Sequence, residues 1–70
     1  MEKNFDVGRR IRTRRNILGI TIVDFADMLG TNSRQVSIWE HLGTVPICFI
    51  RDICLILDVT PDFLFGYAIS

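Results

Sequence analysis

Residues 21–42, TIVDFADMLGTNSRQVSIWEHL, decide the fold of this chain, because they read as two short helices joined by a tight turn. The hydroxyl of Thr21 can accept a hydrogen bond from the free amides of an opening helical turn. Gly30 can adopt the left-handed conformation that ends a helix. Between them, apolar residues recur on one helical face. These residues are Phe25, Ala26 and Leu29. The pattern predicts a helix over residues 22–29.

The second half of the stretch predicts a helix over residues 33–41, with Asn32 as its cap. Its inward face is expected to carry Val36, Trp39 and Glu40. Its outward face is expected to carry Ser33, Arg34, Gln35, Ser37 and Ile38. A short helix with an outer face of amide and guanidinium groups has what reading a DNA major groove requires. The stretch therefore predicts a helix-turn-helix, although a purely structural two-helix corner with a glycine turn would look similar.

The remainder of the chain predicts three more helices and no strand. Residues 6–18 carry an apolar stripe made of Val7, Ile11 and Leu18. Residues 47–57 follow Pro46, which can open a helix at no hydrogen-bonding cost, and their inward face is Ile50, Ile53, Cys54 and Leu57. A cap at Thr60 and a start at Pro61 predict a short helix over residues 61–65. We expect an all-α, five-helix domain over residues 6–66, with a loose arm at 1–5 and a tail at 67–70.

Length and composition narrow the class of protein. Seventy residues make one domain near the lower limit of independent folding, and 49% hydrophobic residues supply its core. The chain has no transmembrane-length apolar run, and MEKNFDVGRR lacks the apolar stretch of a signal peptide, so a cytoplasmic protein is the default. With a lone His41 and no cluster of acids, nucleophile or phosphate loop, we expect no enzyme, no cofactor and no small-molecule substrate.

The two cysteines are expected to be small buried side chains. Cys48 and Cys54 are six residues apart on one predicted helix, which separates their Cα atoms by roughly 9 Å, too far for a disulfide. No third or fourth ligand accompanies them, so a zinc site is not expected.

Charge is distributed unevenly along the chain although the formal net charge is zero. Six of the eight basic residues precede position 16, namely Lys3, Arg9, Arg10, Arg12, Arg14 and Arg15. Local potential, and not the total, governs attraction to phosphates. The basic first helix is therefore compatible with nucleic-acid binding, and a solvated charged helix face is the alternative.

Three segments together resemble a known family. From Val7 to Gly66 the chain is similar to the phage repressor and Cro-type (XRE-like) helix-turn-helix proteins, through RIRTRRNILGIT, FADMLGTNSRQVSIWEHLG and LDVTPDFLFG. The resemblance implies a compact lambda-repressor-like domain that binds double-stranded DNA and regulates transcription. In that family a homodimer sets two recognition helices about 34 Å apart on a near-palindromic operator.

The resemblance also implies roles for individual residues. The residues expected to contact base edges are Ser33, Arg34, Gln35 and Ile38. The residues expected to contact phosphates are Thr21, Ile22, Asn32, His41, Thr44 and Arg12. Arg15 lies on the apolar stripe of the first helix by spacing, and the family pairs an arginine there with a glutamate near the end of the recognition helix. We therefore expect a partly buried Arg15–Glu40 ion pair.

Three departures from the family keep a second hypothesis open. Ile22 stands where glutamine is common, and Ile38 stands where a polar or basic residue is favoured. Leu42 also replaces the usual glycine. An exposed patch of Ile22, Val23 and Ile38 would suit a protein-interaction module, such as an antitoxin or adaptor, on a repressor-like fold.

Dimerisation is a separate expectation. A domain of this size cannot cover all of its large apolar side chains alone, so some should lie at a two-fold interface. The candidates are Phe49, Ile56, Phe65, Tyr67 and Ile69.

Overall fold

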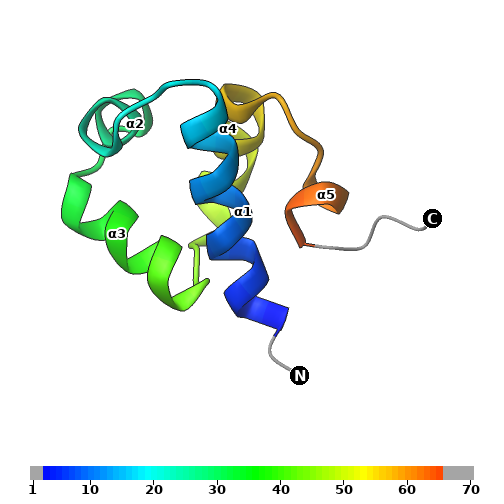
Figure 1. Ribbon diagram of the computed structural model, residues 1–70. Helices are drawn as coiled ribbons and strands as arrows, with labels where there is room; N and C mark the ends of the chain where they lie inside the picture. The colour runs from blue at the N-terminus through cyan, green and yellow to red at the C-terminus, as the bar shows by residue number, and fades with distance from the viewer. Residues whose placement is uncertain (1–2, 66–70) are drawn as a thin grey trace.

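The computed structural model describes residues 3–65, and side chains from Val7 onward. Every regular element in this part of the chain is a helix (Figure 1). The helices are α1 Lys3–Ile17, α2 Ile22–Leu29, α3 Ser33–Leu42, α4 Ile47–Leu57 and α5 Pro61–Phe65. The predicted all-α class with five helices is confirmed, and α2, α4 and α5 have the predicted bounds.

Helix α1 differs from the prediction at both ends. It begins at Lys3, so residues 3–5 belong to the helix and not to a loose arm. No glycine or proline lies between Lys3 and Val7 to interrupt the helix. At the other end α1 stops at Ile17, and Gly19 takes φ 73°. Leu18 therefore leaves the helical stripe and is 42% exposed, where the periodicity predicted a core residue.

The core forms where α1 crosses the other helices. Figure 1 shows α1 in the middle, with α2 and α3 to one side, α5 to the other and α4 behind it. The largest fully buried side chains come from all five helices: Phe25, Ile11, Ile53, Leu57, Leu64 and Val36. The inward positions predicted for α2 and α3 are confirmed, because Phe25, Ala26, Leu29, Val36 and Trp39 are all buried.

Gly8 allows α1 and α3 to approach closely. A Cβ atom built on Gly8 would lie 2.7 Å from the carbonyl oxygen of Trp39, and it would also meet the carbonyl group of Glu40. Real Cβ contacts are essentially never that short. A residue without a side chain at position 8 is therefore required for α1 to pack against the last turns of α3.

Helix α4 is only partly covered by the rest of the chain. Ile53, Cys54 and Leu57 are buried as predicted, whereas Ile50 is half-buried. Cys48 is exposed, which corrects the expectation that both cysteines are buried. The reason is rotational: Cys48 lies on the far side of α4 from Ile53 and Leu57. Asp58 ends the helix at φ 57°, with its N–H donating to the carbonyl of Cys54.

The predicted dimer residues belong largely to the chain's own core. Phe49, Ile56 and Phe65 are partly buried and pack against the core cluster. The Phe49 ring lies 4.9 Å from the Trp39 ring, centroid to centroid. Tyr67 and Ile69 lie outside the described residues. The apolar side chains that α4 and α5 expose instead are Ile47, Leu55 and Phe63.

Candidate nucleic-acid interface

The α2–α3 unit is built by the local signals in its sequence. The Thr21 hydroxyl accepts a hydrogen bond from the Asp24 amide at 3.1 Å. Gly30 ends α2 at φ 77°, and its N–H donates to the carbonyls of Ala26 and Asp27. The Asn32 side chain accepts from the Gln35 amide at 2.9 Å and opens α3. The turn between the helices is therefore fixed by two side-chain caps and one left-handed glycine.

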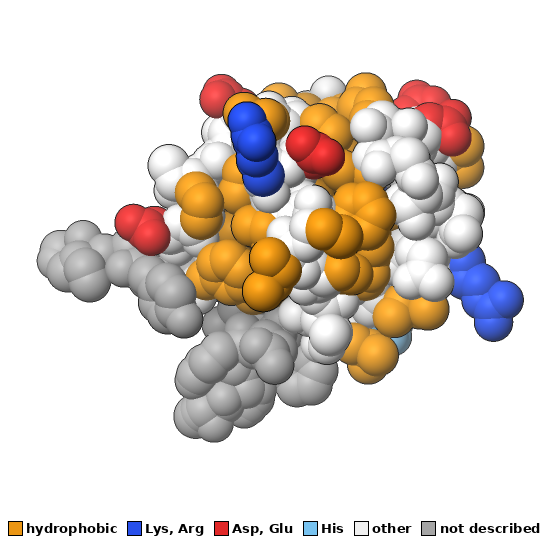
Figure 2. All heavy atoms as spheres, turned by 180° about the vertical axis from the view of Figure 1, so that it is seen from behind, with side chains coloured by type: hydrophobic (Ala, Val, Ile, Leu, Met, Phe, Trp, Pro, Cys, Tyr) orange, Lys and Arg blue, Asp and Glu red, His pale blue; other side chains and the backbone are white. Residues whose placement is uncertain are grey.

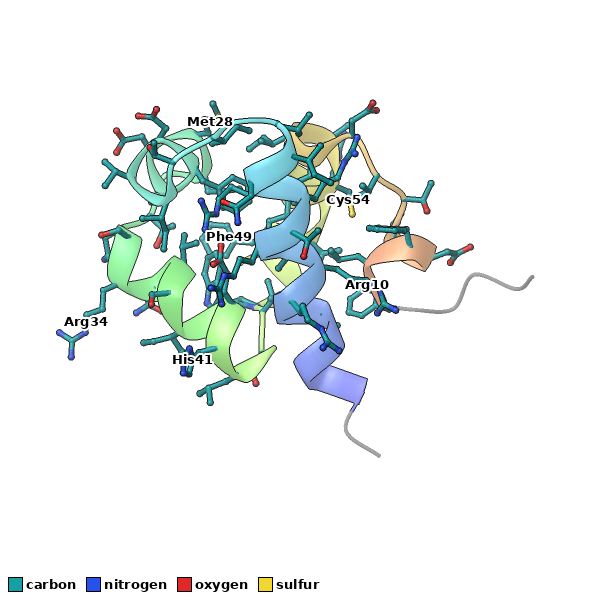
Figure 3. The ribbon with its side chains drawn as sticks, in the orientation of Figure 1. Arg10, Met28, Arg34, His41, Phe49 and Cys54 are labelled. Atoms are coloured by element: carbon teal, nitrogen blue, oxygen red, sulfur yellow. The ribbon has the colours of Figure 1, made fainter. Side chains whose placement is uncertain are left out.

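The outer face of α3 is free of the core. Arg34, Gln35, Ser37, Ile38 and His41 are exposed, and Ser33 is half-buried. Figure 3 shows Arg34 pointing away from the body of the molecule, with its guanidinium group beyond the other side chains. Ile38, 39% exposed, adds an apolar group to this face. We call the surface formed by Arg34, Gln35, Ser37 and Ile38 the α3 face.

An ion pair holds the opposite side of α3 against α1. Arg15 Nε donates to Glu40 Oε2 at 2.8 Å, and Arg15 Nη2 donates to Glu40 Oε1 at 3.2 Å. Arg15 Nη1 also donates to the Ile20 carbonyl at 2.9 Å. The two side chains are only 10% and 8% exposed. The Arg15–Glu40 pair implied by the family resemblance is therefore present, and it is bidentate, which fixes orientation as well as distance.

A shallow hollow lies at the amino end of α2. It has a volume of about 410 Å³ and is lined by Arg15, Asn16, Gly19, Ile20, Thr21 and Ile22. The first amides of α2 have no partner within the helix, and the helix dipole favours an anion at this end. The Ile22 side chain is half-buried against the core. Position 22 can therefore offer a phosphate only its backbone N–H, whereas a glutamine there would also offer a side-chain amide. Sequence reasoning missed Asn16, because a lone polar residue near a helix end carries no distinguishing signal.

The other proposed phosphate contacts lie on different elements. Arg12 is exposed on α1, His41 is exposed in the last turn of α3, and Thr44 is exposed in the loop after it. Thr21 and Asn32 are also exposed, but each side-chain oxygen already serves as a helix cap. Their remaining hydrogen-bonding capacity is what a phosphate could use.

The basic cluster of α1 is partly used inside the molecule. Arg14 Nε donates to the Leu57 carbonyl at 2.9 Å and so satisfies the carboxyl end of α4. The Arg10 guanidinium lies 6.0 Å from the centre of the Phe63 ring, on α5. Arg15 is bound to Glu40. Of the arginines in this cluster, Arg9 and Arg12 are exposed. The charge that α1 offers to phosphates is therefore smaller than the sequence indicated.

Among the side chains of residues 7–65, no three His, Cys, Asp or Glu gather into a group that could hold a metal ion. Within residues 3–65, no helix is both long and apolar enough to cross a membrane. Comparisons of the chain with protein-family models, with curated proteins and with solved structures give no match.

Proposed function

We propose that this protein is a sequence-specific regulator of transcription that binds double-stranded DNA through the α3 face. It binds a near-palindromic operator as a homodimer and represses transcription from it. The observation that carries the proposal is the α3 face itself. It combines an extended arginine, a glutamine and an isoleucine on the exposed side of a short, capped helix.

Each group on the α3 face has a partner in the major groove. Arg34 can donate two hydrogen bonds to O6 and N7 of guanine, and Gln35 can pair with N6 and N7 of adenine. Ile38, one helical turn further along, can contact the methyl group of thymine. A good bidentate contact contributes about 1–3 kcal/mol of discrimination against the wrong base. Together these residues would read a short half-site, while Ser33 and Ser37 offer adaptable hydrogen bonds.

The helices around α3 supply rigidity and a phosphate contact. The bidentate Arg15–Glu40 pair and the close approach at Gly8 hold α3 against α1, so its outer face is presented in one orientation. A pre-oriented surface loses less conformational entropy on binding than a mobile one. The amides at the amino end of α2, beside Asn16, would bind a phosphate of the same groove and set the register of α3 along the duplex.

The proposal is tested by fluorescence anisotropy on a site selected from a random DNA pool. Affinity should fall steeply with salt, because each neutralised phosphate releases counterions. Arg34→Ala should weaken binding and relax preference at one base pair, at a cost of about 1–3 kcal/mol. Arg34→Lys is the matched control: it keeps the charge but loses the guanidinium fork, so it should relax preference with little change in the salt slope.

A phosphate contact should respond differently. Arg12→Ala should weaken binding to all sequences alike and reduce the salt slope by about one. Binding that does not change with salt or with Arg34 would reject DNA as the partner.

A second function, docking of a protein partner, is favoured by one observation. Val23 and Met28 on α2 are each 56% exposed, and Ile38 on α3 is 39% exposed. These apolar side chains belong to the same helix pair as the α3 face and would suit an apolar partner surface. Ile22, expected in this patch, is half-buried and contributes less. If DNA is the partner, Val23→Ser should change the DNA affinity by no more than about twofold relative to the unaltered chain, because Val23 is not among the proposed base contacts.

A further inference from the structure

The exposed side of α4 carries a pattern that the proposed DNA contacts do not use. We call it the α4 stripe; it consists of Ile47, Cys48, Arg51, Asp52 and Leu55, all exposed. Ile47 is 88% exposed and Leu55 is 68% exposed. Figure 2 shows the side of the molecule on which α4 lies, and apolar side chains cover much of it. Arg51 and Asp52, which carry opposite charges, are exposed on the same helix as these apolar residues.

The order of residues within the stripe follows from helix geometry. Cys48 and Leu55 are seven residues apart, which is about two helical turns, so they lie one above the other along the centre of the stripe. Arg51 and Asp52 are consecutive, about 100° apart around the helix axis, and they fall on opposite sides of that centre line. One flank of the stripe is therefore basic and the other acidic, at the same height along α4.

We propose that the α4 stripe binds the α4 stripe of a second copy of this chain, with the two helices roughly parallel about a two-fold axis. In that arrangement the basic flank of one helix faces the acidic flank of the other. Arg51 meets Asp52 of the second copy, and the same pair forms again by symmetry. Cys48 and Leu55 each meet their own counterparts at the centre.

Charge complementarity selects this occupant and this orientation. In an antiparallel two-fold packing each flank would face itself, so Arg51 would lie against Arg51 and Asp52 against Asp52 of the second copy. Like charges brought together across an interface oppose association. The parallel arrangement satisfies both charges without any other partner. Within residues 7–65, neither Arg51 nor Asp52 has an ion pair inside its own chain.

A groove beside the stripe adds apolar surface to the same interface. It has a volume of about 520 Å³ and is lined by Ile47, Ile50, Arg51, Cys54, Leu55, Val59, Thr60 and Pro61. Three of these residues belong to the stripe, so the groove is continuous with it. Interfaces of this kind place apolar contacts at the centre and charged pairs at the rim.

The α4 pairing assigns an interface to the homodimer of the proposed function. It rests on the proposed function in taking the active form to be a homodimer. Pairing through α4 leaves the α3 face uncovered: in Figure 3 Arg34 points away at the side of the molecule, while α4 lies behind α1. The interface also replaces Phe49 and Ile56, expected as dimer contacts, with the residues that α4 exposes.

The first test exchanges the two charges and measures self-association of the full chain by sedimentation. We expect the unaltered chain to sediment as a dimer of 8.0 kDa subunits at tens of micromolar. Arg51→Asp and Asp52→Arg should each weaken association about tenfold or more, because each sets like charges together twice. The double variant Arg51→Asp/Asp52→Arg should restore it. Far-UV circular dichroism checks that each variant remains folded.

The second test uses the thiol at the centre of the stripe. Mild oxidation with copper phenanthroline should join two chains through Cys48, because a parallel pairing places the two thiols at the same height. The cross-link should vanish in Cys48→Ser and persist in Cys54→Ser. An antiparallel pairing would separate the two thiols by roughly 10 Å along the helix axes, beyond disulfide reach.

Two results overturn the inference: a chain that sediments as a monomer at tens of micromolar, or a double variant that associates no better than the single ones. Arg34→Asp separates this failure from a failure of the proposed function. That substitution should abolish DNA binding and leave self-association unchanged, since Arg34 lies outside the α4 stripe.

Discussion

The substitution Glu40→Ala tests how much the Arg15–Glu40 ion pair contributes to the fold. It leaves the Arg15 guanidinium nearly enclosed, with one remaining hydrogen bond, to the Ile20 carbonyl. Both side chains are at most 10% exposed, so solvent cannot replace the lost carboxylate. Removing one partner of a buried pair typically costs about 3–5 kcal/mol, because an uncompensated charge stays buried.

That cost is large for a chain of this size. At about 0.05–0.15 kcal/mol per residue, 70 residues have a total stability of about 3.5–10 kcal/mol. Glu40→Ala should therefore remove more than a quarter of it, and at the lower end of this range the loss would bring the protein close to its unfolding midpoint in water. Urea denaturation followed by far-UV circular dichroism measures the change as a lower midpoint at an unchanged slope. Fluorescence of the buried Trp39 provides a second probe of the same transition.

The matched control replaces both charges with apolar side chains of similar volume. Arg15→Met/Glu40→Leu should recover most of the lost stability, since replacing a whole buried pair is often neutral or stabilising. If Glu40→Ala costs less than about 1 kcal/mol, the pair behaves as a surface salt bridge and the reasoning from its burial is wrong.

Three further perturbations test other features of the fold. Gly8→Ala should destabilise the protein by about 1–3 kcal/mol or more in urea denaturation, because the added methyl would meet the backbone of Trp39 at 2.7 Å. Asn32→Ala should lower the free energy of unfolding by about 1 kcal/mol through loss of the α3 cap. Asn32→Asp should keep most of that stability, because aspartate can also accept the capping hydrogen bond. Burial raises the pKa of the Cys54 thiol, so at neutral pH, and at a dilution where the chain is monomeric, Cys54 should react with iodoacetamide much more slowly than the exposed Cys48 in the folded protein.

Each of these expectations can fail in a distinct way. Alanine normally stabilises a helix interior relative to glycine, so a gain of stability in Gly8→Ala would refute the close approach of α1 and α3. An unchanged urea midpoint in Asn32→Ala would mean that another group caps α3. Equal labelling rates of the two cysteines under native conditions, separated by mass spectrometry of peptides, would contradict the burial of Cys54.

The sequence by itself determined the elements of this protein that depend on local interactions. Thr21, Gly30 and Asn32 act on amides within a few residues, so the bounds of α2 and the start of α3 could be predicted from spacing. The same holds for the cap at Thr60 and the start of α5. The inward faces of α2 and α3 followed from their apolar periodicity, because a short amphipathic helix has only one side to bury.

Only the tertiary structure decided which side chains of α1 and α4 are used inside the molecule. Arg14 and Arg10 looked like surface charge, but they serve the end of α4 and the Phe63 ring, which lie far away in sequence. Phe49 looked available for a partner, but it packs on Trp39. Such contacts depend on how whole helices cross, and the period of a single helix does not specify the crossing. The same packing leaves one side of α4 uncovered and so exposes the α4 stripe, including Arg51 and Asp52.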